Sequence, residues 1–324
     1  MDEAIDVAGL ATGTLLVVGA GTMGQQIALQ AALQGVTVVL TDISDAQLSS
    51  ARARIQELLD GRVAKGRITA DAASAALGHL TLTSDLAGAG PACSWAIEAV
   101  AERLDVKARV FAELASLLPA DAGLASNSSH IRAATISEGK EWAQRCLNMH
   151  FFHPVLVMDL VEVVPSPATS PRYLEAAVAW SYRIRRKPLV LRRDLDGFLV
   201  NRILGEASRE AFAMLSSGVA SFSDIDAAVT RGLRWPLGPF QLADLSGIDI
   251  LLQSRSDRYE RHGSPGDLAT VKVLGPMVRQ DRLGRKVGLG FYDYSVDPPQ
   301  PIPLPSESIQ GEATTAEDAG PAEQ

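Results

Sequence analysis

The stretch that most limits what this chain can fold into is a glycine motif near its start, formed by Gly19, Gly21 and Gly24 with Thr22 and Met23 between the last two. It follows a short apolar run and precedes a segment with helical spacing. In a strand–turn–helix unit the first glycine allows a tight turn and the second lets a pyrophosphate approach the backbone. The third lets the helix pack closely on the strand. The motif therefore predicts a dinucleotide-binding turn at residues 19–24.

An acidic residue supports this interpretation. Asp42 ends the next apolar run, at the spacing expected for a carboxylate that binds a ribose hydroxyl. The alternative is an unrelated glycine-rich turn, and the order of strand, turn, helix and acid favours the dinucleotide site over it. Ile43 and Ser44 follow Asp42 where an arginine would be needed to accept a 2′-phosphate. The predicted cofactor is NAD, not NADP.

The first half of the chain alternates apolar β-rich runs with helical segments, which is typical of a doubly wound parallel sheet. The predicted strands are 15–18, 36–41, 96–100 and 124–126. The predicted helices are 25–34, 45–59, 106–118 and 131–138. Beyond residue 197 the pattern is helical, at 198–217, 223–232, around 242–259 and 267–280, until a short strand at 290–294. The fold class is α/β: an N-terminal Rossmann-type sheet followed by a smaller all-α domain.

The domain limits follow from composition and from residues that break helices. Residues 183–193 are the predicted connector, because Lys187 and Pro188 interrupt any helix there. From residue 297 the chain is rich in Pro, Ser, Glu, Ala and Gln, so it buries too little apolar surface to fold. We predict an N-terminal extension at 1–13, a Rossmann domain at 14–193, a helical domain at 194–296 and a disordered tail at 297–324.

Composition excludes several other classes of protein. The net charge is -8 with no basic stripe, which argues against a nucleic-acid partner. No apolar run approaches membrane-spanning length, and the acidic start lacks the basic residues of a signal peptide. Cys93 and Cys146 are the only cysteines, too few for a disulfide framework or a metal set. We expect a cytoplasmic protein that binds no metal, membrane or nucleic acid.

Two residues suggest acid–base chemistry. His150 and Glu162 lie in apolar runs on either side of residues 154–159. If that segment connects two antiparallel strands, the two residues face each other with Cβ atoms about 5 Å apart. A carboxylate that orients a histidine makes a general base that works near neutral pH. The alternative is a buried structural ion pair.

Polar residues also follow two predicted central strands, where ligands bind in open α/β sheets. Glu98, Glu102 and Lys107 follow one strand, but spacing alone does not separate them from an ordinary charge cluster at a helix start. Ser129 and His130 follow the next strand. Their segment could bind substrate or could cap a helix.

Together these residues resemble the 3-hydroxyacyl-CoA dehydrogenase family, over residues 14–294. The resemblance implies that His150 is the catalytic histidine and Glu162 its partner. It also implies that Ser129 contacts substrate and cofactor, and that Glu102 and Lys107 lie near the cofactor. Two C-terminal segments, 235–244 and 284–292, match the family as well.

The resemblance adds three further site residues, and the sequence departs from the family pattern at two positions. Asn201 matches the active-site asparagine, Lys286 joins the cofactor set, and Lys65 is a candidate contact for a CoA phosphate. His153 replaces the usual asparagine near the nicotinamide and adds a titratable group near His150. His130 stands where a second serine is common.

The implied activity is NAD-dependent oxidation of a (3S)-3-hydroxyacyl-CoA to the 3-ketoacyl-CoA, or the reverse, in fatty acid metabolism. The short chain implies a stand-alone enzyme of the 3-hydroxybutyryl-CoA dehydrogenase type, a homodimer through its helical domain. One alternative is a dehydrogenase of a free hydroxy acid or a carrier-bound hydroxyacyl group, and another is a non-catalytic NAD-binding protein. The residues leave acyl-chain length, carrier and direction open.

Overall fold

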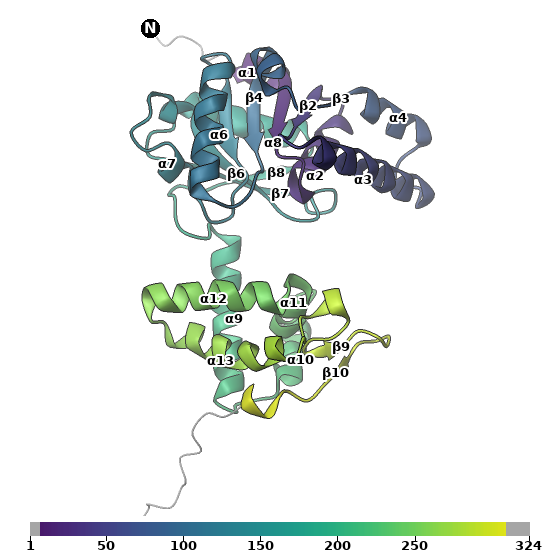
Figure 1. Ribbon diagram of the computed structural model, residues 1–324, viewed down its shortest axis with the longest axis vertical. Coiled ribbons are helices and arrows are strands. Elements are labelled where there is room, and N and C mark those ends of the chain that lie inside the picture. Colours follow the sequence, from purple (N-terminus) through teal and green to yellow (C-terminus); the bar gives the residue numbers. More distant parts are fainter. Residues whose placement is uncertain (1–6, 309–324) are drawn as a thin grey trace, which may run out of the picture. The chain divides into compact units, whose positions relative to one another are not determined.

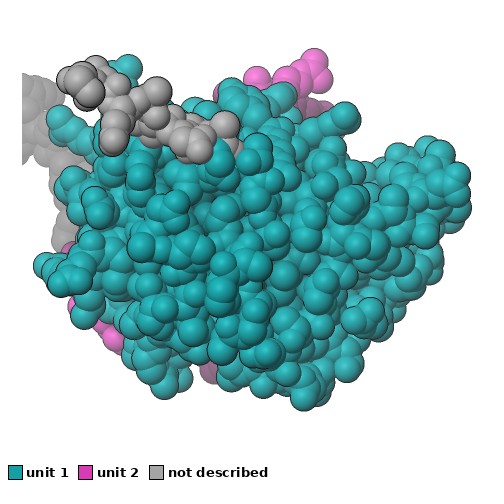
Figure 2. Space-filling view, turned by 90° about the horizontal axis from the view of Figure 1, so that it is seen from above, with its two compact units in different colours: residues 1–202 teal, residues 203–324 magenta. Residues whose placement is uncertain are grey.

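The computed structural model describes residues 7–308 and divides the chain into two compact units. Unit 1 comprises residues 1–202 and unit 2 residues 203–324 (Figure 2). The sequence predicted this boundary after residue 193, so the N-terminal unit extends further along the chain than expected.

Unit 1 is built on an eight-stranded sheet with the order β3-β2-β1-β4-β5-β6-β7-β8. The first six strands in this order run parallel, β7 is antiparallel to β6, and β8 is parallel to β7. This topology confirms the predicted Rossmann-type sheet. The strands are β1 (Thr14–Val18), β2 (Val38–Thr41), β3 (Leu80–Thr83), β4 (Cys93–Glu98), β5 (Gly123–Ser126), β6 (Cys146–Phe151), β7 (Leu160–Pro165) and β8 (Lys187–Val190).

Helices cover both faces of this sheet, which is why its central strands are apolar on both sides (Figure 1). In β1, Leu15 and Val17 pack in the core cluster that holds α2 and α8, whereas Leu16 and Val18 pack in the cluster that holds α6 and α7. The helices of unit 1 are α1 (Val7–Thr12), α2 (Thr22–Ala32), α3 (Asp45–Ala64), α4 (Ala70–Gly78), α5 (Leu86–Ala89), α6 (Leu104–Leu117), α7 (Ala133–Ile136) and α8 (Pro171–Arg183).

Two segments at the margins of unit 1 differ from the sequence prediction. The predicted connector at 183–193 contains β8, which lies at the edge of the sheet. An edge strand tolerates Pro188 because one side of the strand has no ladder to complete. The predicted extension at 1–13 contains α1, in which Leu10 is buried and its carbonyl accepts a hydrogen bond from Trp180 Nε1 at 2.8 Å.

Unit 2 is helical, as predicted, with an aromatic core formed by Phe212, Phe222, Phe240 and Phe291. Its elements are α9 (Val200–Ser216, which begins in unit 1), α10 (Phe222–Gly232), α11 (Pro239–Ser246), α12 (Ile248–His262), α13 (Pro265–Arg279), β9 (Tyr292–Asp293) and β10 (Gln300–Pro301). Among residues 7–308 no helix combines the length and apolar character needed to cross a membrane.

The predicted disordered tail is ordered in its first part. Within residues 297–308, β10 pairs with β9, Arg282 donates to Pro303 O at 2.7 Å, and Ser308 donates to Val273 O at 3.0 Å. Disorder was predicted from average composition, which does not register that a buried arginine holds this segment through its backbone carbonyls. The rest of the predicted tail, 309–324, lies outside the described residues.

Candidate active site

The glycine motif forms the turn between β1 and α2, and its glycines have different roles. Gly19 has a φ of +102°, which favours glycine. A Cβ on Gly24 would lie 1.8 Å from Gly19 O, so this position is filled by the turn itself. A Cβ on Gly21 would meet nothing within 4 Å. Gly21 therefore faces open space at the start of α2, where Thr22 and Met23 follow and a phosphate could approach free N–H groups.

Asp42 lies beside this turn, directly after β2. Its carboxylate accepts hydrogen bonds from Ala20 N at 2.8 Å and Ser44 N at 3.0 Å. The next side chain, Ile43, is fully exposed and carries no charge. The arrangement places a carboxylate, and no adjacent cation, where the adenosine ribose of a dinucleotide binds in this fold, which fits NAD.

His150 and Glu162 pair across β6 and β7 in the register that the sequence predicted. His150 Nδ1 lies 2.8 Å from Glu162 Oε2, and both side chains are buried. The other carboxylate oxygen, Oε1, accepts from Leu199 N at 3.0 Å and Val200 N at 2.9 Å. His150 Nε2 lies 3.0 Å from the hydroxyl of Ser129. With Nδ1 held by the carboxylate, Nε2 is the ring nitrogen that can exchange a proton with a ligand.

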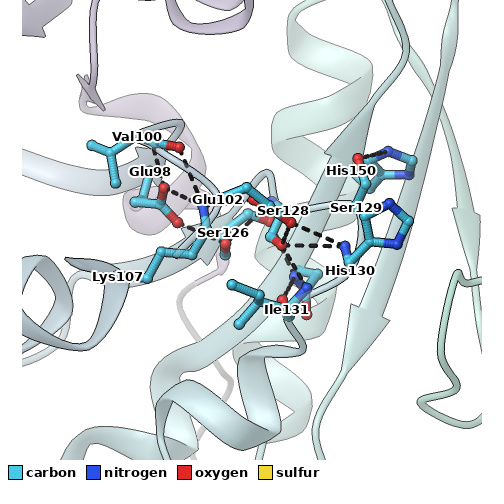
Figure 3. A network of polar contacts seen from close by, with 11 residues as sticks. Glu98, Val100, Glu102, Lys107, Ser126, Ser128, Ser129, His130, Ile131 and His150 are labelled. Carbon is cyan, nitrogen blue, oxygen red and sulfur yellow. Dashed lines mark hydrogen bonds and ion pairs between the residues drawn. The ribbon is translucent and has the colours of Figure 1, made fainter. Parts of the chain in front are cut away.

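A second charged cluster follows β4 and β5 on the same edge of the sheet (Figure 3). Lys107 of α6 is 1% exposed, and its Nζ lies 2.7 Å from Glu98 Oε1 and 3.2 Å from Glu102 Oε2. The alternative of an ordinary charge cluster at a helix start is therefore wrong for Glu98 and Lys107, which point inward. Spacing could not show this, because the direction of a side chain after a strand depends on the turn that follows.

Glu102 remains ionised in this cluster near neutral pH. Partial burial raises the pKa of Glu102, but the hydrogen bond from the Ser128 hydroxyl, the charge of Lys107 and the hydrogen bond from His130 N outweigh it, so the pKa lies below its usual value. The side chain of Glu102 is 41% exposed, so its charge faces the edge of the sheet where a ligand would bind.

The other predicted site residues lie at different distances from this centre. Asn201 directly follows Val200, whose N–H binds Glu162, and its side chain is partly buried. His153 is exposed in the connection between β6 and β7. Lys65 is exposed at the C-terminal end of α3. Lys286 belongs to unit 2, where its Nζ lies 2.6 Å from both carboxylate oxygens of Asp249.

The fold and this site define a class of protein. A glycine turn beside a ribose-type carboxylate lies at the same edge of one largely parallel sheet as a buried histidine–glutamate pair. This combination is that of a nicotinamide-dependent dehydrogenase with a doubly wound sheet.

Comparison with known families makes the class specific. Residues 14–195 match the model of the 3-hydroxyacyl-CoA dehydrogenase NAD-binding domain, and residues 197–294 match the model of that family's C-terminal domain. The chain belongs to the 3-hydroxyacyl-CoA dehydrogenase family. It is an oxidoreductase acting on CH–OH groups of hydroxyacyl-CoA, and the predictions of NAD and of this activity are confirmed.

Individual relatives agree with the family. The chain is 37% identical over 279 residues to a 3-hydroxybutyryl-CoA dehydrogenase of Mycobacterium tuberculosis, which covers 86% of this chain and 97% of that protein. It is 35% identical to a 3-hydroxyadipyl-CoA dehydrogenase of Escherichia coli, over 88% of this chain and 59% of that protein. The crystal structure of (S)-3-hydroxybutyryl-CoA dehydrogenase from Ralstonia eutropha is similar with a TM-score of 0.80, at 34% identity, over 88% of this chain and all of that chain.

Proposed function

We propose that His150 is the general base that removes the 3-hydroxyl proton of a (3S)-3-hydroxyacyl-CoA, and the general acid in the reverse direction. The observation that carries this proposal is the 2.8 Å contact between His150 Nδ1 and the buried Glu162 carboxylate. The carboxylate fixes the ring and stabilises the imidazolium that forms. NAD, when bound, takes up the hydride that leaves C3. The products are the 3-ketoacyl-CoA and NADH, with the proton on His150 Nε2.

Ser129 and Asn201 orient the oxygen on C3 in this proposal. The Ser129 hydroxyl lies 3.0 Å from His150 Nε2, within reach of the same oxygen as the base. Asn201 stands in the first turn of α9, beside the N–H groups that hold Glu162. Both side chains can donate a hydrogen bond to a developing ketone or alkoxide.

The cofactor set extends from the glycine turn to the second cluster. Gly19, Gly21 and Gly24 form the turn, followed by the first residues of α2, and Asp42 holds the ribose. Further members are Glu102, Lys107, Ser129, His153 and Lys286. Their place along the carboxyl edge of the sheet supports this assignment for the residues of unit 1. For Lys286 the support is the family's C-terminal domain, which covers it.

The substrate we propose is a short acyl-CoA. The support is the similarity to relatives named for 3-hydroxybutyryl-CoA and 3-hydroxyadipyl-CoA. Lys65, exposed at the end of α3, is the candidate contact for a CoA phosphate. A different carrier or a free hydroxy acid is favoured only by His153, which replaces the asparagine usual in the family.

The test is NADH oxidation by purified protein with acetoacetyl-CoA. Free acetoacetate tests the need for the carrier, and NADPH tests the choice of cofactor. We expect turnover with the CoA ester and NADH that exceeds both controls. Turnover with acetoacetate alone would replace the acyl-CoA assignment. NADH binding without turnover on any hydroxyacyl or hydroxy-acid substrate would mean a non-catalytic protein.

We also propose a homodimer formed through unit 2, and a cytoplasmic location. Exposed large apolar side chains on unit 2, such as Ile203, Leu233 and Ile250, support the first, because contact with a second copy would remove them from water. Two unpaired thiols, Cys93 and Cys146, support the second. Sedimentation equilibrium should give twice the chain mass of 34.4 kDa, and the chain mass itself would contradict the dimer.

A further inference from the structure

Glu98, the last residue of β4, is fully buried, and its carboxylate has three close partners while its backbone carbonyl has a fourth. Oε1 accepts from Lys107 Nζ at 2.7 Å and from Val100 N at 2.7 Å. Oε2 accepts from the Ser126 hydroxyl at 2.7 Å, and the Glu98 carbonyl accepts from Asn127 N at 2.8 Å. A buried carboxylate is costly unless it is paired and hydrogen-bonded in this way. The contacts of Glu98 with Ser126 and Asn127 join the ends of β4 and β5, the two strands whose loops lie at the edge of the sheet where a ligand would bind.

One arm of this network, the contacts that start at Glu98 Oε1, connects through Lys107 to Glu102, a proposed cofactor residue. Lys107 Nζ has three donors and three acceptors close by: Glu98 Oε1, Glu102 Oε2 at 3.2 Å and Val100 O at 3.5 Å. Lys107 is 1% exposed, whereas the side chain of Glu102 is 41% exposed. Through Lys107, Glu98 therefore fixes the one member of this group whose charge faces solvent.

The other arm leads to the loop that carries Ser129 (Figure 3). The Ser126 hydroxyl donates to Glu98, so its oxygen is free to accept from Ser128 N at 3.2 Å. Ser128 in turn donates to Glu102 and accepts from Ile131 N at 2.7 Å. The two arms thus meet at the Ser128–Glu102 hydrogen bond and close a ring of contacts.

The loop held in this way contacts the catalytic strand at two points. The Ser129 hydroxyl lies 3.0 Å from His150 Nε2. Asn127 Oδ1 accepts from Phe151 N at 3.0 Å, directly beside His150. A shift of the loop would therefore change the distance between Ser129 and the proton-transferring nitrogen.

We propose that Glu98 is a positioning residue for the reaction. From one buried carboxylate it sets Glu102 on the cofactor side and Ser129 on the His150 side. The assignment rests on the function proposed above. It predicts that neutralising Glu98 disturbs cofactor binding and turnover together, whereas removing only the Ser126 hydroxyl lowers turnover more than cofactor affinity.

The decisive variant is Glu98→Gln, which preserves side-chain volume. Lys107 and Ser126 donate to different oxygens of the carboxylate, and an amide keeps only one of these oxygens, so one of the two contacts loses its acceptor. The amide also leaves Lys107 with a single anionic partner. Ser126→Ala removes only the second arm. Glu113→Gln is the matched control, since Glu113 is an exposed glutamate on the same helix as Lys107 and lies outside these contacts.

NADH affinity is measured by fluorescence without substrate, and kcat and KM with acetoacetyl-CoA. Folding is checked by circular dichroism. For Glu98→Gln we expect the NADH Kd to rise and kcat to fall, each about tenfold or more, as for other misplaced supporting residues. For Ser126→Ala we expect a similar fall in kcat with a smaller rise in the NADH Kd, because Ser126 acts only on the loop that carries Ser129 and leaves the Glu98–Lys107 contact in place. Glu113→Gln should match the wild type in both.

A folded Glu98→Gln protein with a lower Tm but wild-type Kd and kcat would overturn the proposal and leave Glu98 a structural residue. If Glu98→Gln does not fold, Ser126→Ala decides: a wild-type kcat overturns the proposal, and a fall in kcat that exceeds the change in NADH Kd supports it. If the wild type itself shows no turnover, the proposed function fails. The ratio of NADH Kd values between Glu98→Gln and Glu113→Gln then still tests the cofactor arm.

Discussion

At the scale of single residues, His150 is held on every side. Its Nδ1 contacts Glu162 at 2.8 Å, its Nε2 contacts Ser129 at 3.0 Å, and the rings of Phe152 and Phe198 lie 4.6 and 5.6 Å from it, centroid to centroid. The side chain therefore loses its conformational entropy when the protein folds, and this loss does not add to the barrier of the reaction. In the proposed mechanism, the ring is thereby oriented for proton transfer before substrate binds.

Replacing Glu162 with glutamine tests this orientation. The new amide oxygen can still accept from Leu199 N and Val200 N, so its NH₂ group faces His150 Nδ1. Because that group donates, Nδ1 must accept, and the ring proton moves to Nε2, where the base is needed. We expect kcat to fall roughly 10²- to 10⁴-fold, as when other buried carboxylate partners of a catalytic histidine become amides.

The measurement is the single-turnover rate of NADH oxidation, with the NADH Kd as control. The Kd should stay within a few-fold of the wild type, because Glu162 is not among the proposed cofactor residues. A variant that keeps wild-type turnover would show that the carboxylate serves only the fold.

Residues of this kind differ in how far sequence can predict them. His150 and Glu162 lie on strands, where period-two alternation and one connecting segment fix which residues face each other. Glu98 and Lys107 are separated by a turn and the start of a helix, so their inward direction followed only from the structure. The sequence alone assigns Glu98 no role of its own. The signal for its burial is a carboxylate at the end of an otherwise apolar strand.

At the scale of elements, the turn between β1 and α2 shows how backbone geometry serves binding. Gly24 lets the helix approach the strand, since its missing Cβ would otherwise lie 1.8 Å from Gly19 O. A side chain on Gly21 would contact nothing in the protein, and in the proposed assignment this room is taken by the pyrophosphate of NAD.

Substitution by alanine should therefore lower NADH affinity at Gly21 and lower stability at Gly24. Gly21→Ala should fold with a Tm near that of the wild type but bind NADH at least about tenfold more weakly, because the methyl group occupies the phosphate approach. Gly24→Ala should lose stability by about 1–3 kcal/mol or more through overpacking. Thermal unfolding and NADH titration check both. Unchanged NADH affinity in Gly21→Ala would remove the pyrophosphate from this turn.

Elements that periodicity marks strongly were predictable, and weakly marked ones were not. Strand β8 is short and contains Pro188, so its sequence is typical of a connector, whereas in the structure it is the edge strand of the sheet. Residues 297–308 are poor in apolar side chains and are held by hydrogen bonds to their carbonyls, which composition does not reveal.

At the scale of the whole molecule, each unit has its own core and its own buried groups. The two cysteines both belong to unit 1, Cys93 in β4 and Cys146 in β6, and both are buried. Burial raises the pKa of the Cys93 thiol to about 11 and raises the pKa of Cys146 further still. Neither thiol is a reactive thiolate at neutral pH.

Thiol labelling should consequently report the unfolding of unit 1. At pH 8 we expect negligible reaction of the native protein with a disulfide reagent and two thiols per chain in denaturant. Fast labelling of a native thiol would contradict the packing of β4 or β6. The matched Cys93→Ser and Cys146→Ser variants would identify which strand is open.

The most direct test of the central claim compares His150→Gln with the wild type in NADH oxidation by acetoacetyl-CoA. If His150 transfers the proton, kcat should fall roughly 10²- to 10⁴-fold, the range that general acid–base catalysis contributes, while the NADH Kd stays nearly unchanged. A variant that turns over within a few-fold of the wild type would contradict the assignment of His150 as the catalytic base.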